Sequence, residues 1–311
     1  MFKLPVNLSP RPGLHELADF LEWDAWQNGF SSARAVAAEL GRIDDNSHNE
    51  GCEDSSDECG ELIEDAFGEV EDRIKSCGGA YPFEITNQGH SMTHCGVRDK
   101  TEHVVYRFLL LVTRMNMKSH KKQGTYDGTQ LFEELMAEVL RNYFGVARVK
   151  SQVFGTAEGN RFSEKVDQLC DQLREGGRFK QWDTGRVKKN DGGIDIVTWL
   201  PFSDGKANQL ILFAQCKTGD SWDNEHGKLR PDAFFKTWTE SRCVSLNPVS
   251  AFCVAEAADR SRWLEYANQT GGLFFDRCRI VDRCSGLSEP LVIKLVDWTA
   301  HALDFLNSRA D

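Results

Sequence analysis

From about residue 100 onward, the spacing of apolar residues predicts helices that alternate with short buried strands. Val104, Phe108, Leu111 and Met115 follow one another at intervals of four, three and four residues, which is typical of one face of a helix. Shorter apolar runs bounded by Gly, Pro, Asp and Ser have the length of strands. Helices are predicted over about 102–117, 129–144, 161–175, 231–243, 259–268 and 296–306, and strands over 147–155, 194–200, 208–217, 249–257 and 272–281. This alternation indicates an α/β fold, with helices packed on a mixed sheet.

The first hundred residues instead predict a mostly helical module. Amphipathic patterns indicate helices over 14–26, 31–43 and 58–77. The segment 44–58 is acidic and lacks large apolar residues, so it cannot bury enough surface to fold alone. Composition changes near Arg98, which divides the chain into an acidic helical module over 1–97 and a second domain over 98–311.

The excess of acidic residues is confined to the N-terminal third. The formal net charge is −11, and residues 1–100 hold 8 Lys and Arg against 20 Asp and Glu, whereas residues 101–311 hold 29 against 28. Such asymmetry suggests two modules with different partners, so the first is predicted to regulate the second or to bind another protein. An ordinary solvated acidic surface is the simpler alternative.

Two central strands predict a hairpin with polar residues at one end. If its turn centres near Gly205, Asp195 lies opposite residues 215–217. Side chains alternate along a strand, so Gln215 and Lys217 share a face and Cys216 points to the other. Buried charges are costly unless they serve each other or a metal, so this end of the hairpin is a candidate site.

The oxygen-bearing residues at this end suit a hard divalent cation, Mg²⁺ or Mn²⁺. Such an ion takes carboxylate and carbonyl oxygens together with water. Asp195, Gln215 and the backbone carbonyl of Cys216 supply three oxygen ligands. Glu133 is the candidate for a further carboxylate, because it lies at the flank of an apolar helix face while Glu134 and Glu138 point to solvent. That face comprises Phe132, Leu135, Met136, Val139, Leu140 and Tyr143.

The order of these motifs resembles that of a known nuclease superfamily. Phe132-Glu133 stands in a helix, Asp191-Gly192-Gly193-Ile194-Asp195 opens a strand, and Gln215-Cys216-Lys217 closes the next. This pattern is similar to the restriction endonuclease-like PD-(D/E)xK nucleases, and most of all to the Mrr-like branch, in which Gln replaces the last acidic residue. The resemblance covers roughly residues 129–255 and implies a restriction endonuclease-like mixed-sheet core flanked by helices.

The resemblance also implies an activity, that of a divalent-metal-dependent DNA endonuclease hydrolysing phosphodiester bonds. Asp195 would be the central metal ligand, Glu133 would bind metal directly or through water, and Gln215 would complete the coordination shell. Lys217 would position and deprotonate the attacking water or stabilise charge on phosphorus. The implied setting is bacterial restriction or anti-phage defence, in which removal of residues 1–95 would raise DNA affinity or basal cleavage if the acidic module is inhibitory.

Basic clusters supply the expected contacts to DNA. They lie in the segments 114–122 and 186–189, and the candidate residues are Lys118, Lys121, Lys122, Arg186, Lys188 and Lys189. His226, which follows the Lys217 strand, is either a phosphate contact or an exposed loop histidine. Cutting both strands with one site per chain predicts a homodimer or a larger complex with a regulatory protein.

Two further features favour a cytoplasmic protein without a membrane partner. The most apolar helical segment carries Arg107 and Arg114 and is too short to span a bilayer. The ten cysteines show no CxxC pair, which fits reduced thiols.

Two other functions are compatible with the sequence. In one, the domain is a non-catalytic nuclease-fold subunit that binds DNA or scaffolds a defence complex, with the neutral Gln215 marking a weakened site. In the other, the substrate is RNA or single-stranded DNA. Metal dependence separates a nuclease from a binder, because only a nuclease loses its activity in EDTA.

Overall fold

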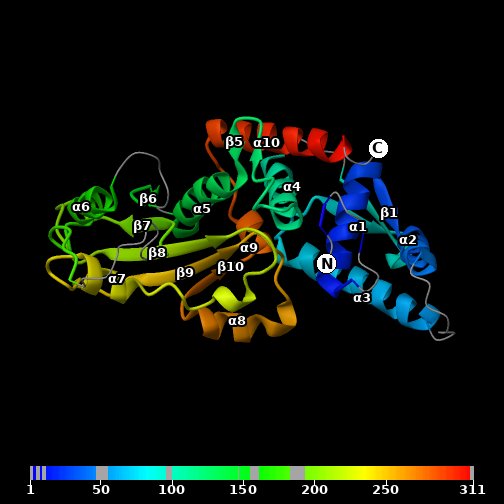
Figure 1. Cartoon of the computed structure of the whole chain (residues 1–311), viewed down its shortest axis with the longest axis horizontal. Coiled ribbons are helices and arrows are strands. Elements are labelled where there is room, and N and C mark those ends of the chain that lie inside the picture. The colour runs from blue at the N-terminus through cyan, green and yellow to red at the C-terminus, as the bar shows by residue number, and fades with distance from the viewer. Residues whose placement is uncertain are drawn as a thin grey trace. The chain divides into compact units, whose positions relative to one another are not determined.

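The chain folds into two compact units, shown in the computed structural model of Figure 1. The first unit comprises Met1–Gly128, Ala255–Arg260 and Asp276–Asp311, and the second comprises Thr129–Val254 and Ser261–Phe275. The structure describes residues 3–4, 8, 12–46, 55–95, 100–145, 147–154, 161–182 and 193–308.

The first unit contains helices from both ends of the chain. Its helices are α1 (Leu14–Asn28), α2 (Ala33–Asn46), α3 (Ser55–Ser76), α4 (Thr101–Arg114), α9 (Arg277–Asp282) and α10 (Glu289–Asn307). It also holds an antiparallel sheet of order β1-β3-β2, formed by Phe30–Ser32, Ser91–His94 and Phe83–Thr86, and a small hairpin of β4 (Lys122–Gln123) and β5 (Tyr126–Asp127). The N-terminal helices lie where the sequence predicts them, but the three-stranded sheet was not predicted.

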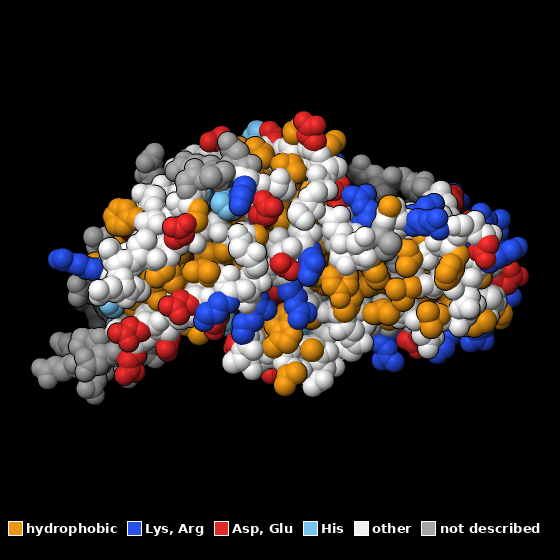
Figure 2. Space-filling view, turned by 180° about the vertical axis from the view of Figure 1, so that it is seen from behind, with side chains coloured by type: hydrophobic (Ala, Val, Ile, Leu, Met, Phe, Trp, Pro, Cys, Tyr) orange, Lys and Arg blue, Asp and Glu red, His pale blue; other side chains and the backbone are white. Residues whose placement is uncertain are grey.

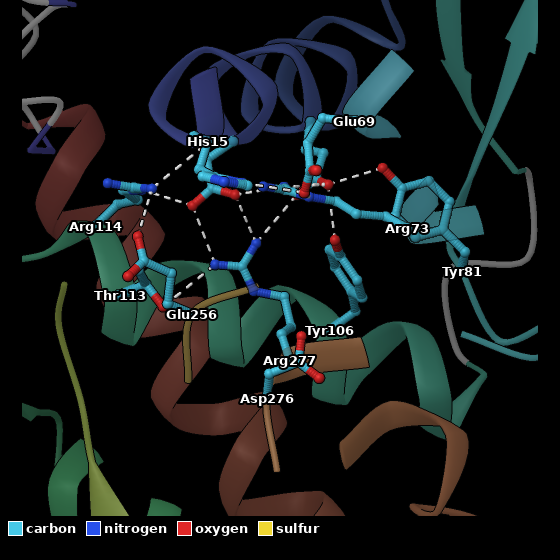
Figure 3. Close-up of polar contacts among 12 residues, drawn as sticks. His15, Glu69, Arg73, Tyr81, Tyr106, Thr113, Arg114, Glu256, Asp276 and Arg277 are labelled. Carbon is cyan, nitrogen blue, oxygen red and sulfur yellow. Dashed lines mark hydrogen bonds and ion pairs between the residues drawn. The ribbon is translucent and has the colours of Figure 1, made fainter. Parts of the chain in front are cut away.

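A buried cluster of charged residues ties α1, α3, α4 and α9 together (Figure 3). The Asp19 carboxylate accepts hydrogen bonds from Arg73 Nη1 at 2.6 Å, Arg114 Nε at 2.6 Å and Arg277 Nη1 at 2.8 Å. Asp19 and the three arginines are at most 1% exposed. These contacts explain why the division of the chain differs from the expected boundary near Arg98, since α4 and α9 are needed to neutralise residues of α1.

A second buried carboxylate completes the cluster. Glu22 Oε1 accepts hydrogen bonds from the hydroxyl groups of Tyr81 and Tyr106, each at 2.7 Å, and from Arg73 Nη1 at 2.8 Å. Burial is the largest influence on the pKa of Asp19 and would raise it, but the three guanidinium groups together hold that pKa well below its usual range. Asp19 is therefore ionised at neutral pH.

The second unit is a five-stranded mixed sheet with helices, which confirms the α/β class. The strands lie in the order β10-β9-β8-β7-β6; β6, β7 and β8 pair antiparallel, while β8, β9 and β10 pair parallel. The strands are β6 (Lys150–Val153), β7 (Ile196–Leu200), β8 (Leu210–Lys217), β9 (Val249–Val254) and β10 (Leu273–Phe275). The helices are α5 (Gly128–Phe144), α6 (Phe162–Leu173), α7 (Pro231–Trp238) and α8 (Trp263–Thr270).

One core of this unit lies between α6, α7 and one face of the hairpin. Val197, Trp199, Ile211 and Phe213 supply the strand residues of this core, and they alternate with residues of the other face as the pleat requires. The α5 face is buried as predicted except at Tyr143, which is 42% exposed and packs edge-on against Phe275.

The predicted strand over 272–281 is wrong beyond Phe275, where the chain turns into α9. Asp276 is the reason, because its buried carboxylate accepts a hydrogen bond from the backbone N–H of Arg279 and so caps the first turn of a helix. The predicted helix over 231–243 is also too long, since α7 ends at Trp238.

The surface mixes both signs of charge with apolar side chains. On the face shown in Figure 2, Lys and Arg are interspersed with Asp and Glu and with hydrophobic residues. Phe202 and Leu264 are the most exposed large hydrophobic residues described, at 62% and 79%. Within the described ranges, no helix has both the length and the apolarity to cross a membrane.

Candidate active site at the end of the central hairpin

The hairpin register brings the predicted residues together. Ile196 pairs with Ala214 in the antiparallel ladder of β7 and β8, which puts Asp195 opposite Gln215. The backbone N–H of Asp195 donates to the carbonyl of Ala214 at 2.9 Å. The structure therefore confirms that Asp195, Gln215 and Lys217 gather at one end of this strand pair.

Gln215 is buried, and its amide oxygen has no hydrogen-bond partner among the described residues. The side chain is on the same face as Phe213, in line with the core beneath α7, and the residue is 7% exposed. Buried polar atoms in proteins are nearly always hydrogen-bonded, so an orphaned amide oxygen indicates a place for a ligand. Gly193 lies beside this amide with φ +60°, and a Cβ there would stand 3.4 Å from Gln215 Nε2. Gly193, two residues before Asp195, thus supplies a left-handed turn, and the added Cβ would make only an ordinary van der Waals contact with the amide.

Asp195 is held by the strand that it faces. Its Oδ2 accepts a hydrogen bond of 2.7 Å from the backbone N–H of Cys216. Burial raises the pKa of Asp195 to about 6, and the Cys216 hydrogen bond and the positive charge of Lys217 oppose that rise. A carboxylate with such a pKa is still ionised at neutral pH but is poorly neutralised by the protein, so a cation would stabilise it.

Lys217 has an acidic partner that the sequence analysis missed. Its Nζ lies 3.2 Å from Oε2 of Glu225, which belongs to the short helix η2 (Asp223–Glu225) in the loop after β8. Glu225 also pairs with Lys228, and the hydrogen bond from Lys228 followed by that from Lys217 lowers the pKa of Glu225. The only sequence signal was an acidic residue eight positions after the lysine, in a loop with other charges.

Glu133 lies near this end of β8, but the described residues do not form an acidic metal cage around it. The pKa of the Cys216 thiol is raised by burial first, then by Cys253, Asp195 and Glu133, which places the Glu133 carboxylate in the neighbourhood of Cys216. No group of three or more His, Cys, Asp or Glu that could hold a metal occurs in the described part of the chain. Metal binding by Glu133 and by the Cys216 carbonyl stays a prediction. The two other glutamates of this helix, Glu134 and Glu138, were expected to point to solvent but are half-buried.

The donors that are in place still fit a hard divalent cation. One charged carboxylate and one buried amide oxygen, which has no partner in the described part of the chain, are an oxygen set of the kind that Mg²⁺ uses with several waters. The sparse protein set suits Mg²⁺ or Mn²⁺ better than Zn²⁺, which prefers nitrogen and sulfur ligands.

A pocket of about 390 Å³ opens beside Gln215. Its lining includes Gly193, Gln215, Lys228, Arg230, Phe234 and Trp238. Two cationic side chains, two aromatic side chains and Gln215 therefore border one cavity, a mixture suited to an anionic ligand with an apolar or aromatic part. Sequence reasoning missed this pocket, because the residues of α7 join Gln215 only through the tertiary fold.

The predicted DNA-binding residues that the structure describes belong to the first unit, whereas the candidate site belongs to the second. Lys118, Lys121 and Lys122 are exposed but belong to the first unit, and Lys121 pairs with Asp127 at 2.8 Å. Arg114, at the start of the same basic segment, is buried in the ion cluster rather than presented to solvent. Four predicted residues lie outside the described residues: Arg186, Lys188, Lys189 and Asp191.

His226 is not an exposed loop residue. Its side chain is 4% exposed, its ring stacks on Tyr266 at 5.6 Å, and Nδ1 lies 3.2 Å from the hydroxyl of Thr270. Burial lowers the pKa of His226, which favours the neutral imidazole. The residue is part of an aromatic core.

No protein-family model, curated protein or solved structure matches this chain. Its class therefore rests on the fold and the site, which define a mixed α/β unit with an Asp–Gln–Lys group at the end of a central hairpin.

Proposed function

We propose that the second unit is a divalent-metal-dependent endonuclease of the PD-(D/E)xK type, Mrr-like branch, that hydrolyses phosphodiester bonds in DNA. The observation that carries the proposal is the buried Gln215 oxygen, which has no hydrogen-bond partner among the described residues and lies opposite a carboxylate that burial destabilises. The order of elements supports it, because Phe132-Glu133 is on a helix, Asp195 opens one strand and Gln215-Cys216-Lys217 closes its neighbour. The same resemblance supports a role in bacterial restriction or anti-phage defence in the cytoplasm.

Each residue has a distinct task in this mechanism. Asp195 and Gln215 would hold a Mg²⁺ or Mn²⁺ ion, which when bound supplies an acidified water and charge neutralisation at the phosphate. Lys217 stands at the same strand end with its side chain one-third exposed, where its ammonium orients the attacking water or donates a hydrogen bond to the phosphate. Glu225 keeps that ammonium in place and is exchanged for the substrate phosphate.

Loss of the Lys217 ammonium tests this function. We expect Lys217→Ala to slow metal-dependent cutting of supercoiled plasmid by roughly 10²-fold or more, the usual contribution of a positioned proton-transfer group. Because Lys217 is not a ligand, Mn²⁺ binding should be retained. Gel assays in Mg²⁺, Mn²⁺ and EDTA measure the cutting, and Lys206→Ala in the exposed hairpin turn is the matched control. Cutting that persists in EDTA would refute the proposal.

Metal affinity should depend on pH through Asp195. Its pKa is raised to about 6, so the carboxylate becomes protonated as pH falls through that value, well before an ordinary aspartate does. We expect the Kd for Mn²⁺ to be constant above about pH 7 and to rise about tenfold per pH unit below about pH 6. Calorimetric titration at a series of pH values measures this Kd. A Kd that stays constant down to about pH 5 would mean that the metal is bound by a carboxylate with an ordinary pKa.

A non-catalytic DNA-binding subunit is the second candidate. It is favoured by one observation, the lack of a three-residue acidic cage among the described residues. Such a protein would hold DNA equally well in Mg²⁺ and in EDTA and would cut it in neither.

A further inference from the structure

Trp182 is an exposed aromatic residue fastened to the wall of the pocket beside Gln215. The residue is 42% exposed, and its indole N–H donates to the carbonyl of Thr239 at 2.8 Å. Thr239 follows Trp238, which lines the pocket and accepts a backbone hydrogen bond of 3.0 Å from Lys180. The indole is thus fixed in direction by its one polar atom while much of its surface stays in water.

Two cations lie over the Trp182 ring. Lys180 Nζ is 4.0 Å from the ring centroid and Arg242 Cζ is 4.8 Å from it, both within the range of a cation–π contact. Neither cation has a carboxylate partner in the described part of the chain. Arg242 has φ +58°, a left-handed conformation that is strained for a residue with a side chain. The chain therefore keeps an unfavourable backbone at the point that brings this guanidinium to the ring.

We propose that Trp182, Lys180 and Arg242 form a stacking platform for an unpaired base of a single-stranded nucleic acid. This inference rests on the proposed nuclease function and specifies its substrate as nucleic acid with unpaired nucleotides next to the cleavage site. The two cations exchange the indole for substrate phosphates, which attract them more strongly. The vacated ring face then receives a base. A duplex cannot use the platform in this way, because the faces of its bases are covered by their neighbours.

The platform lies beside the Gln215 pocket, which suits it to bind nucleotides next to the cleavage site. Lys228 and Arg230 line the pocket on the loop that leads into α7, and Trp238 closes it at the end of the same helix. The Trp182 indole donates a hydrogen bond to the residue that follows Trp238, so the platform lies next to one end of the pocket lining. Alternating cations and aromatic rings are the usual composition of a single-strand path.

Binding in EDTA tests the platform separately from cleavage. The probes are a labelled oligothymidylate of about 20 nucleotides and a duplex of the same length, followed by fluorescence anisotropy. We expect Trp182→Ala to weaken single-strand binding about tenfold and duplex binding less than about twofold, and Trp182→Phe to retain most of the affinity. Replacing Lys180 and Arg242 together by Gln should reduce the slope of log affinity against log salt by about 1.4, the value for two phosphate contacts on a single strand.

Phe202→Ala is the matched control, because Phe202 is an exposed aromatic residue of the same unit, in the turn between β7 and β8. Unchanged single-strand binding in Trp182→Ala, or an equal loss on both probes, would overturn the platform. A chain that cuts plasmid normally with such a result keeps the nuclease function and loses this inference. A wild-type chain that binds neither probe in EDTA also overturns the platform, and a chain that cuts no DNA in Mg²⁺ or Mn²⁺ loses the proposed function itself.

Discussion

Asp195→Asn should abolish metal-dependent cleavage while leaving the fold intact. The amide can still accept the hydrogen bond from the backbone N–H of Cys216, since it keeps an oxygen of similar geometry. It cannot supply the negative charge that a divalent cation needs, so we expect Mn²⁺ binding to disappear and cleavage to fall by roughly 10³-fold or more. Plasmid cleavage and calorimetric metal titration measure the two losses.

The change in folding stability of Asp195→Asn separates a metal-binding role of Asp195 from a structural one. Burial raises the pKa of Asp195 to about 6, so keeping the carboxylate ionised at neutral pH disfavours the folded state, and the cost appears as pH rises from the ordinary aspartate pKa toward that value. Asp195→Asn should therefore be at least as stable as the wild type in EDTA at neutral pH. Asp204→Asn, at the other end of the hairpin, is the control. An inactive variant that is also much less stable would make Asp195 a structural residue.

The candidate site could be predicted from sequence to the extent that it depends on one hairpin. Alternation along β8 and a turn near Gly205 were enough to put Asp195 opposite Gln215, because both follow from local chain geometry. Glu225 and Trp238 could not be found in this way. They reach the strand end through a loop and a helix whose direction is set by packing.

The fold was predicted less well where segments far apart in the sequence neutralise or hydrogen-bond one another. Asp19 and Arg277 are 258 positions apart and share a hydrogen bond, yet the sequence predicts Asp19 on a helix and Arg277 in a strand, with nothing that links the two. The β2–β3 hairpin was missed for another reason. Its turn uses Asn87 and Gln88 at positive φ, without the Asn-Gly or Asp-Gly pair that marks the tightest hairpins.

The buried ion cluster also changes how the N-terminal module can be tested. A chain without residues 1–95 would lose the acidic partners of Arg114 and Arg277 on α1. These two guanidinium groups would be left in a core with little to neutralise them, which is among the most destabilising changes known. Higher DNA affinity in such a chain would report a damaged first unit as readily as the release of an inhibitor, so point substitutions on its surface are the better test.

Asp19→Asn should be the most destabilising conservative substitution in the first unit. The carboxylate pairs with Arg73, Arg114 and Arg277 at once, and the amide would leave three buried guanidinium groups with one fewer negative charge. Breaking a buried pair in this way costs about 3–5 kcal/mol of folding free energy. For a unit of this size we expect the midpoint of thermal unfolding to fall by roughly 10 °C.

Scanning calorimetry measures this shift, and Asp24→Asn is its control. Asp24 lies on the same helix, about one turn further on, where it accepts a hydrogen bond from Asn28 at the surface, so its replacement should change the midpoint by less than about 2 °C. The pKa of Asp19 lies well below its usual range, so its stabilising effect is present above the unfolded-state pKa and is lost only as pH falls through the lower, folded-state value. The difference between variant and wild type should therefore be as large at about pH 5 as at about pH 7. Equal midpoints for Asp19→Asn and Asp24→Asn would mean that the cluster contributes nothing to holding α1 against α3, α4 and α9.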